Sequence, residues 1–139
     1  MPAEYEIDEA RGRLEARYFG ELTPEEFRAL ADRVQDDPRL RADFDHLADF
    51  TDVTRFGLGA EAVAEEVRRH LAVDARRADS PHRIAIAAPD DVAYGMSRIF
   101  SARRESERVR LGVFRSRSAA EAWLDAPPDT PAEAMDGNA

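Results

Sequence analysis

The acidic residues Asp49, Asp52, Asp90 and Asp91 are the side chains whose types and positions could bring chemistry to one place. Each pair follows an apolar stretch that we expect to be a strand, and the carboxyl ends of parallel strands are the usual address for sites in open α/β sheets. Paired carboxylates can do acid–base work, but no histidine, serine nucleophile or basic clamp accompanies these. Asp90 is placed to cap a helix, and Asp49 and Asp52 could equally form a turn. We therefore expect no enzyme.

A glycine pair, Gly57 and Gly59, together with Ala62 matches the letters of a dinucleotide-binding fingerprint. Backbone amides in such a loop could hold a pyrophosphate. However, the preceding stretch is polar, and no acidic residue closes the next strand about 20 positions on, since Asp90 comes too late. We expect a flexible helix entry here and keep nucleotide binding as the third function hypothesis.

Metal and redox chemistry have little support in the sequence. The histidines His46, His70 and His82 fall on an expected strand, helix and connector, and none stands four residues from another histidine. The chain has no cysteine, which excludes a disulfide, a thiolate zinc site and a thiol nucleophile. We expect neither a metal nor a cofactor.

Charge and length bound the class of protein further. A chain of 139 residues fits one domain, and its net charge of -9 argues against nucleic-acid binding, which needs a basic surface. All 20 basic residues are arginine, which fits GC-rich codons or a saline cytoplasm. No apolar run approaches the ~20 residues of a membrane span, and the amino terminus lacks a signal-peptide pattern. We expect a cytoplasmic protein.

The elements that would position these residues are clearest between residues 83 and 124. An apolar run predicts a buried strand over 84–88, and Val92, Met96, Ile99 and Phe100 share one face of a helix that opens at Asp90. Alternation predicts a strand over 109–114, and helical spacing returns over 119–124. We expect Trp123 to pack against the sheet edge rather than to bind a ligand.

The first half of the chain reads as a hairpin, a helix, a strand and a second helix. Gly12 suits the hairpin turn, and Thr23 with Pro24 and Glu26 marks a helix start. A strand is expected over 44–50, followed by a polar loop over 51–55 and a helix whose apolar face includes Val63, Val67 and Leu71. A charged connector over 73–81 leads to the next strand.

Motifs along residues 4–125 resemble the SpoIIAA-like family, bacterial relatives of STAS domains. The resemblance rests on the hairpin, the Thr-Pro-Glu-Glu helix start, the strand ending in Asp49, and the runs 83–87, 94–96, 113–115 and 121–124. It implies a single α/β domain over 1–125, with a five-stranded mixed sheet, an amino-terminal antiparallel hairpin and about four helices. The proline-rich composition of 126–139 predicts a disordered tail without core residues.

The function that the resemblance implies first is a non-enzymatic regulatory module that binds an unidentified protein partner. Family antagonists carry a phosphorylated serine at the position of 57–59, where this chain has none. Thr51 and Thr54 are poor substitutes. We expect partner contacts at Asp49, Thr51, Asp52, Thr54, Arg55, Gly57 and Gly59. A homodimer is a further expectation.

An apolar-molecule carrier is the alternative, since a second branch of the family resembles CRAL-TRIO lipid carriers. Phe56, Met96 and Phe100 could line the space for such a ligand. The same stripe of methionine and aromatic residues also fits an ordinary core face.

Overall fold

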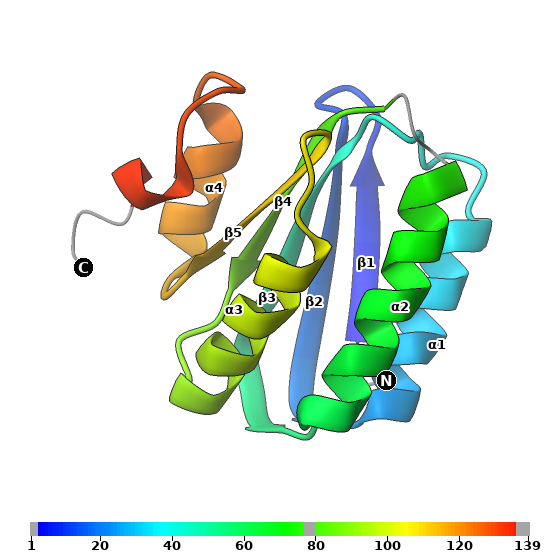
Figure 1. Ribbon diagram of the computed structural model, residues 1–139, viewed down its shortest axis with the longest axis vertical. Helices are drawn as coiled ribbons and strands as arrows, with labels where there is room; N and C mark the ends of the chain where they lie inside the picture. The colour runs from blue at the N-terminus through cyan, green and yellow to red at the C-terminus, as the bar shows by residue number, and fades with distance from the viewer. Residues whose placement is uncertain (1–2, 77–79, 136–139) are drawn as a thin grey trace.

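The computed structural model describes residues 3–76 and 80–135. Within that part of the chain, one five-stranded sheet is combined with four α-helices (Figure 1). The strands are β1 (Ala3–Asp8), β2 (Arg13–Leu22), β3 (Asp45–Phe56), β4 (His82–Ala87) and β5 (Val109–Phe114). The helices are α1 (Pro24–Asp36), α2 (Ala60–Arg76), α3 (Asp91–Arg104) and α4 (Arg117–Asp125), followed by a short 3-10 turn, η1 (Ala132–Met135). The predicted α/β fold is confirmed.

The strands stand side by side in the order in which they occur in the chain. β1 and β2 are antiparallel, whereas β2, β3, β4 and β5 are parallel neighbours. Right-handed crossovers that all step in the same direction leave their helices on one face of the sheet. α1, α2 and α3 accordingly lie together on one side, and α4 lies apart from them (Figure 1).

Local signals in the sequence account for the hairpin and for the helix starts. Gly12 has a φ of 65° in the turn between β1 and β2, a conformation that favours glycine. The Thr23 hydroxyl accepts a hydrogen bond from the Glu26 amide, and the Glu26 carboxylate accepts one from the Thr23 amide. Asp90 caps α3 by accepting a hydrogen bond from the Ala93 amide at 3.0 Å. These predicted caps are confirmed.

Two apolar clusters fill the two faces of the sheet. The larger lies under α1, α2 and α3, and the smaller lies under α4 around Trp123 and Phe114, whose ring centroids are 5.6 Å apart. Trp123 is fully buried, as expected from its spacing. The buried guanidinium of Arg83 donates hydrogen bonds to the carbonyl oxygens of Trp123 and Leu124 and so closes the end of α4.

The polar stretch expected as a loop over 51–55 is instead part of β3. That prediction was wrong because the long strand β2 continues to pair with β3 as far as Leu22 and Phe56, beyond the last β3–β4 pair at Asp49 and Ala87. Helix α2 likewise runs through Val73 to Arg76, where a connector was expected. The rest of that connector includes residues 77–79, which lie outside the described residues.

Three apolar residues assigned to buried helix faces are exposed. Leu71, Val92 and Ile99 are 43%, 57% and 40% accessible to solvent. On α3 the buried positions are instead Ala93, Ser97, Ser101 and Arg104. The small side chains of Ala93, Ser97 and Ser101 are on the buried side of α3. The bulkier Val92 and Ile99 are therefore on its solvent side.

The segment after α4 folds back over the smaller cluster as far as residue 135. The Trp123 Nε1 group donates a hydrogen bond to the Thr130 carbonyl at 2.8 Å, and Ala132 and Met135 pack against the cluster. Residues 126–135 contribute no fully buried side chain, but the indole N–H of Trp123 and the surface of the smaller cluster give this segment contacts with the domain. Residues 136–139 lie outside the described part of the chain.

Candidate functional site

A cavity of about 110 Å³ lies between the sheet and the helices α1, α2 and α3. Phe56, Met96 and Phe100, the residues predicted to line an apolar space, all line it. Small side chains on the facing strands, Ala16 and Ala48, leave room there. Apolar cavities of roughly 150 Å³ are known to bind benzene, so this one approaches the size of a small organic ligand.

One end of the cavity is polar because of α2. Val63, Glu66, Val67 and His70 follow the spacing of one helix face and all point toward the larger cluster, although two of them are ionisable. Glu66 is 3% exposed and accepts a hydrogen bond from Arg28 at 3.3 Å. Burial raises the pKa of Glu66 even though Arg28 opposes the shift.

His70 is held in one orientation and one protonation state. Its Nδ1 lies 2.7 Å from the Glu66 carbonyl oxygen, which can only accept, so Nδ1 carries the proton. The His70 ring is perpendicular to Phe100 at a centroid distance of 5.3 Å and lies 6.4 Å from Phe27. Burial, aided by the positive charge of Arg104, lowers the pKa of His70 to about 4. The imidazole is therefore neutral at pH 7.

A second ion pair, between α2 and α3, completes the polar end. Arg104 donates two hydrogen bonds to the Asp74 carboxylate, both at 2.9 Å. Both side chains are largely buried and line the cavity. Arg28 is also paired with Glu66. The two acidic side chains at the polar end of the cavity, Glu66 and Asp74, therefore each have an arginine partner.

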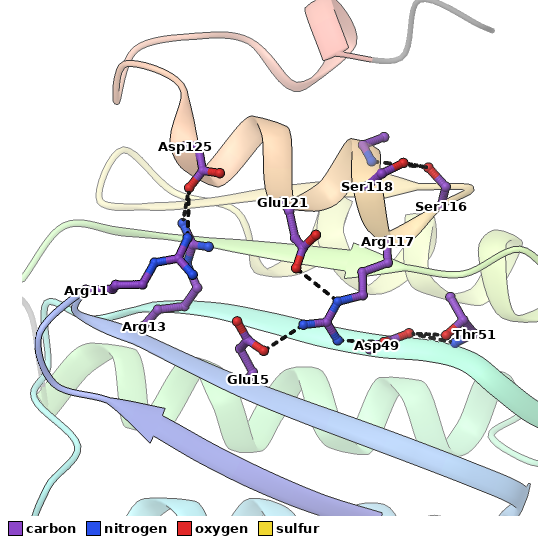
Figure 2. Close-up of polar contacts among 11 residues, drawn as sticks. Arg11, Arg13, Glu15, Asp49, Thr51, Ser116, Arg117, Ser118, Glu121 and Asp125 are labelled. Carbon is purple, nitrogen blue, oxygen red and sulfur yellow. Dashed lines mark hydrogen bonds and ion pairs between the residues drawn. The ribbon is translucent and has the colours of Figure 1, made fainter.

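The opposite face of the sheet carries a separate polar cluster (Figure 2). Arg117 on α4 bonds Glu15 on β2 at 2.6 Å, Asp49 on β3 at 2.9 Å and Glu121 on its own helix at 3.0 Å. Asp49 is buried and also accepts hydrogen bonds from Thr51. Burial opposes the shift, yet the hydrogen bonds from Thr51 and Arg117 lower the pKa of Asp49. The cluster ties α4 to two strands.

The remaining acidic residues predicted as site candidates do not gather there. Asp52 is exposed and lies 3.5 Å from Arg17, and Asp91 is exposed and pairs with Arg115. Asp90 caps α3. The four aspartates have different partners and form no acid–base arrangement.

Some residues between Thr54 and Gly59 are exposed on the surface, and others make backbone contacts that hold the fold. Thr54 and Arg55 are exposed, and Arg55 lies 3.8 Å from Glu21. The Gly57 amide donates to the Leu22 carbonyl at 2.8 Å, and a Cβ on Gly57 would lie 2.5 Å from that oxygen. This close approach explains why residue 57 is a glycine. The Gly57 amide is also already hydrogen-bonded, so it is not available to bind a phosphate.

The histidines expected to be separate are partly brought together. The rings of His46 and His82 are 5.3 Å apart, and His46 and His70 both line the cavity. Within residues 3–76 and 80–135, no three acidic, histidine or cysteine side chains form a group that could hold a metal ion. The same ranges contain no helix of sufficient length and apolarity to cross a bilayer.

Sequence reasoning missed Glu66, His70, Asp74 and Arg104 as residues of the site. The signal available was the shared helix face of Val63, Glu66, Val67 and His70, which placed a glutamate and a histidine among core positions.

The site and the fold together describe an α/β domain with an internal, partly polar cavity. No model of a known protein family matches the sequence. A comparison with curated proteins likewise finds no match. The resemblance to the SpoIIAA-like family therefore stays a prediction.

Proposed function

We propose that this protein is a non-enzymatic domain that binds a small, mainly apolar molecule in the cavity beneath α2 and α3. The observation that carries the proposal is the cavity of about 110 Å³. Ligand sites are typically concave and lined mostly by apolar and aromatic side chains, with a few polar groups that orient the ligand. The apolar and aromatic lining includes Phe56, Met96 and Phe100. The orienting polar groups lie on the buried face of α2.

The polar groups at the cavity favour binding over catalysis. Glu66 and Asp74 are each paired with an arginine, and His70 is protonated only well below neutral pH. A general base needs a pKa near the working pH and contact with the proton that it removes. These residues are therefore better suited to orient a bound molecule than to transform it.

Filling the cavity tests the proposal. In the variant Ala16→Leu an isopropyl group is added at the cavity wall. We expect the free energy of unfolding to stay close to that of the wild type and the binding of toluene, followed by NMR, to be lost. The matched variant Ala85→Leu adds the same group to the packed cluster on the other face and should cost about 1–3 kcal/mol.

A control for binding is Ala102→Leu, at an exposed position of α3, which should leave toluene binding intact. Native mass spectrometry of the protein purified from its own host would reveal a retained natural ligand. The proposal fails if toluene does not bind the wild type, or if Ala16→Leu binds toluene as well as Ala102→Leu does.

A protein-interaction module is the second candidate, and the extension of β3 favours it. β4 pairs with β3 only from His46 to Asp49, so among the described strands the later part of β3 pairs with β2 alone, through Asp52, Val53, Arg55 and Phe56. An unpaired strand edge can add an extended segment of a partner protein. Asp52, Thr54 and Arg55 are exposed on this segment.

Replacing Asp52, Thr54 and Arg55 together by alanine tests this surface. We expect cross-linking to partner proteins in the host to fall while the helical signal in circular dichroism is unchanged. Sedimentation of the purified protein shows whether the partner is a second copy of the chain. If every cross-link survives the triple replacement, this surface is not the interface.

A further inference from the structure

The side chains that line the cavity indicate the chemical class of its ligand, an inference that rests on the proposed function. The polar end decides the class, because apolar walls accept many shapes. We infer that the ligand is an uncharged, hydroxyl-bearing apolar molecule, an alcohol or a phenol, whose hydroxyl donates a hydrogen bond to Nε2 of His70.

The tautomer of His70 provides the acceptor. Nδ1 donates its proton to the Glu66 carbonyl at 2.7 Å, which leaves the lone pair of the neutral ring on Nε2. No hydrogen bond within residues 3–76 and 80–135 is found at that atom. His70 lines the cavity, so a hydroxyl in the cavity can donate a hydrogen bond to this acceptor.

The aromatic neighbours keep the His70 ring in place before a ligand arrives. Phe100 meets the ring edge-to-face, and Phe27 is tilted against it at a centroid distance of 6.4 Å. An acceptor held by packing loses little rotational freedom on binding, which favours affinity. Because the pKa of His70 is about 4, the acceptor is present throughout the neutral range.

Charge compensation argues against an anionic ligand such as a fatty-acid carboxylate. Arg104 uses Nε and Nη2 on Asp74, and Arg28 uses Nη2 on Glu66. A carboxylate entering the cavity would lose its hydration and meet Glu66 and Asp74 without a free cation to pair with. An uncharged hydroxyl avoids that cost.

The test compares phenol, toluene and benzoate, which share a ring and differ in one substituent. Dissociation constants for the wild type are measured by NMR titration at pH 7. We expect phenol to bind about tenfold more tightly than toluene, the factor given by one net hydrogen bond, and benzoate not to bind. In His70→Phe, which keeps an aromatic ring, phenol should lose its advantage over toluene.

A direct readout of the acceptor is the ¹⁵N resonance of His70 Nε2 in the wild type. It should shift with phenol and stay in place with toluene, which also keeps the inference testable if His70→Phe does not fold. Equal affinities of phenol and toluene, or tight binding of benzoate, would overturn this inference and leave the proposed function standing. Failure of all three probes to bind would overturn both.

Discussion

Acidification should destabilise this fold through His70. The pKa of the buried ring falls from its ordinary value of 6.5 to about 4, so the unfolded chain takes up the proton first as the pH drops. Stability is therefore complete above pH 6.5 and is lost between pH 6.5 and pH 4. For this shift the loss between pH 7 and pH 5 is roughly 2 kcal/mol, and it approaches about 3 kcal/mol below pH 4.

Neighbouring groups modify this pH dependence in known directions. His82 adds to the loss, because burial lowers its pKa as well. Glu66 opposes it, because burial raises its pKa and the folded state takes up that proton more readily. The ion pair of Asp74 and Arg104 faces the same space. The contribution of His70 must therefore be measured as a difference between two proteins.

The assay is urea unfolding by circular dichroism at pH 7 and pH 5, on the wild type and on His70→Phe. The variant keeps an aromatic ring beside Phe100 and cannot be protonated. We expect the wild type to lose roughly 2 kcal/mol more than the variant between the two pH values. Equal losses in the two proteins would show that His70 is solvated in the folded state and would refute the reasoning.

Four substitutions away from the cavity give further stability predictions, each measured by urea unfolding followed by circular dichroism. Trp123→Ala should cost about 3–5 kcal/mol, because the side chain is fully buried; a loss below about 1 kcal/mol would mean that the indole faces solvent. Gly57→Ala should cost about 1–3 kcal/mol through its clash with the Leu22 carbonyl, whereas Gly59→Ala, with open space around it, should cost less. Thr23→Ala should cost about 1 kcal/mol by removing the cap of α1, and an unchanged midpoint would contradict that role.

Local chemistry made much of the fold predictable. Some signals depend only on neighbours in the sequence: the caps at Thr23 and Asp90, the glycine turn at Gly12 and the alternation over β5. The helices, the turn and the strand form where these residues indicate. The parallel arrangement follows from the alternation of strands and helices.

The errors arose where a distant partner decides the outcome. Residues 51–55 are mostly polar, yet they extend β3 because β2 is long enough to pair with this segment. The segment after α4 has few apolar residues, yet the indole of Trp123 gives it a hydrogen-bond partner and a surface. Glu66 lines a cavity only because α1 and α3 pack beside α2, which the sequence of α2 alone does not indicate.

The same limit applies to the candidate site. Phe56, Met96 and Phe100 could be named from their apolar spacing, and the structure brings them to one cavity. The compensation of Glu66 by Arg28 and of Asp74 by Arg104 depends on three helices meeting. No spacing within one helix indicates such pairs.

The sequential order of the strands has a consequence for how the chain folds as it leaves the ribosome. Each new strand pairs with the strand made just before it, so no strand has to enter between two that are already joined. Contacts between sequence neighbours close short loops and favour fast folding. The sheet can therefore grow in the order of synthesis, with β5 and the Trp123 cluster completing it last.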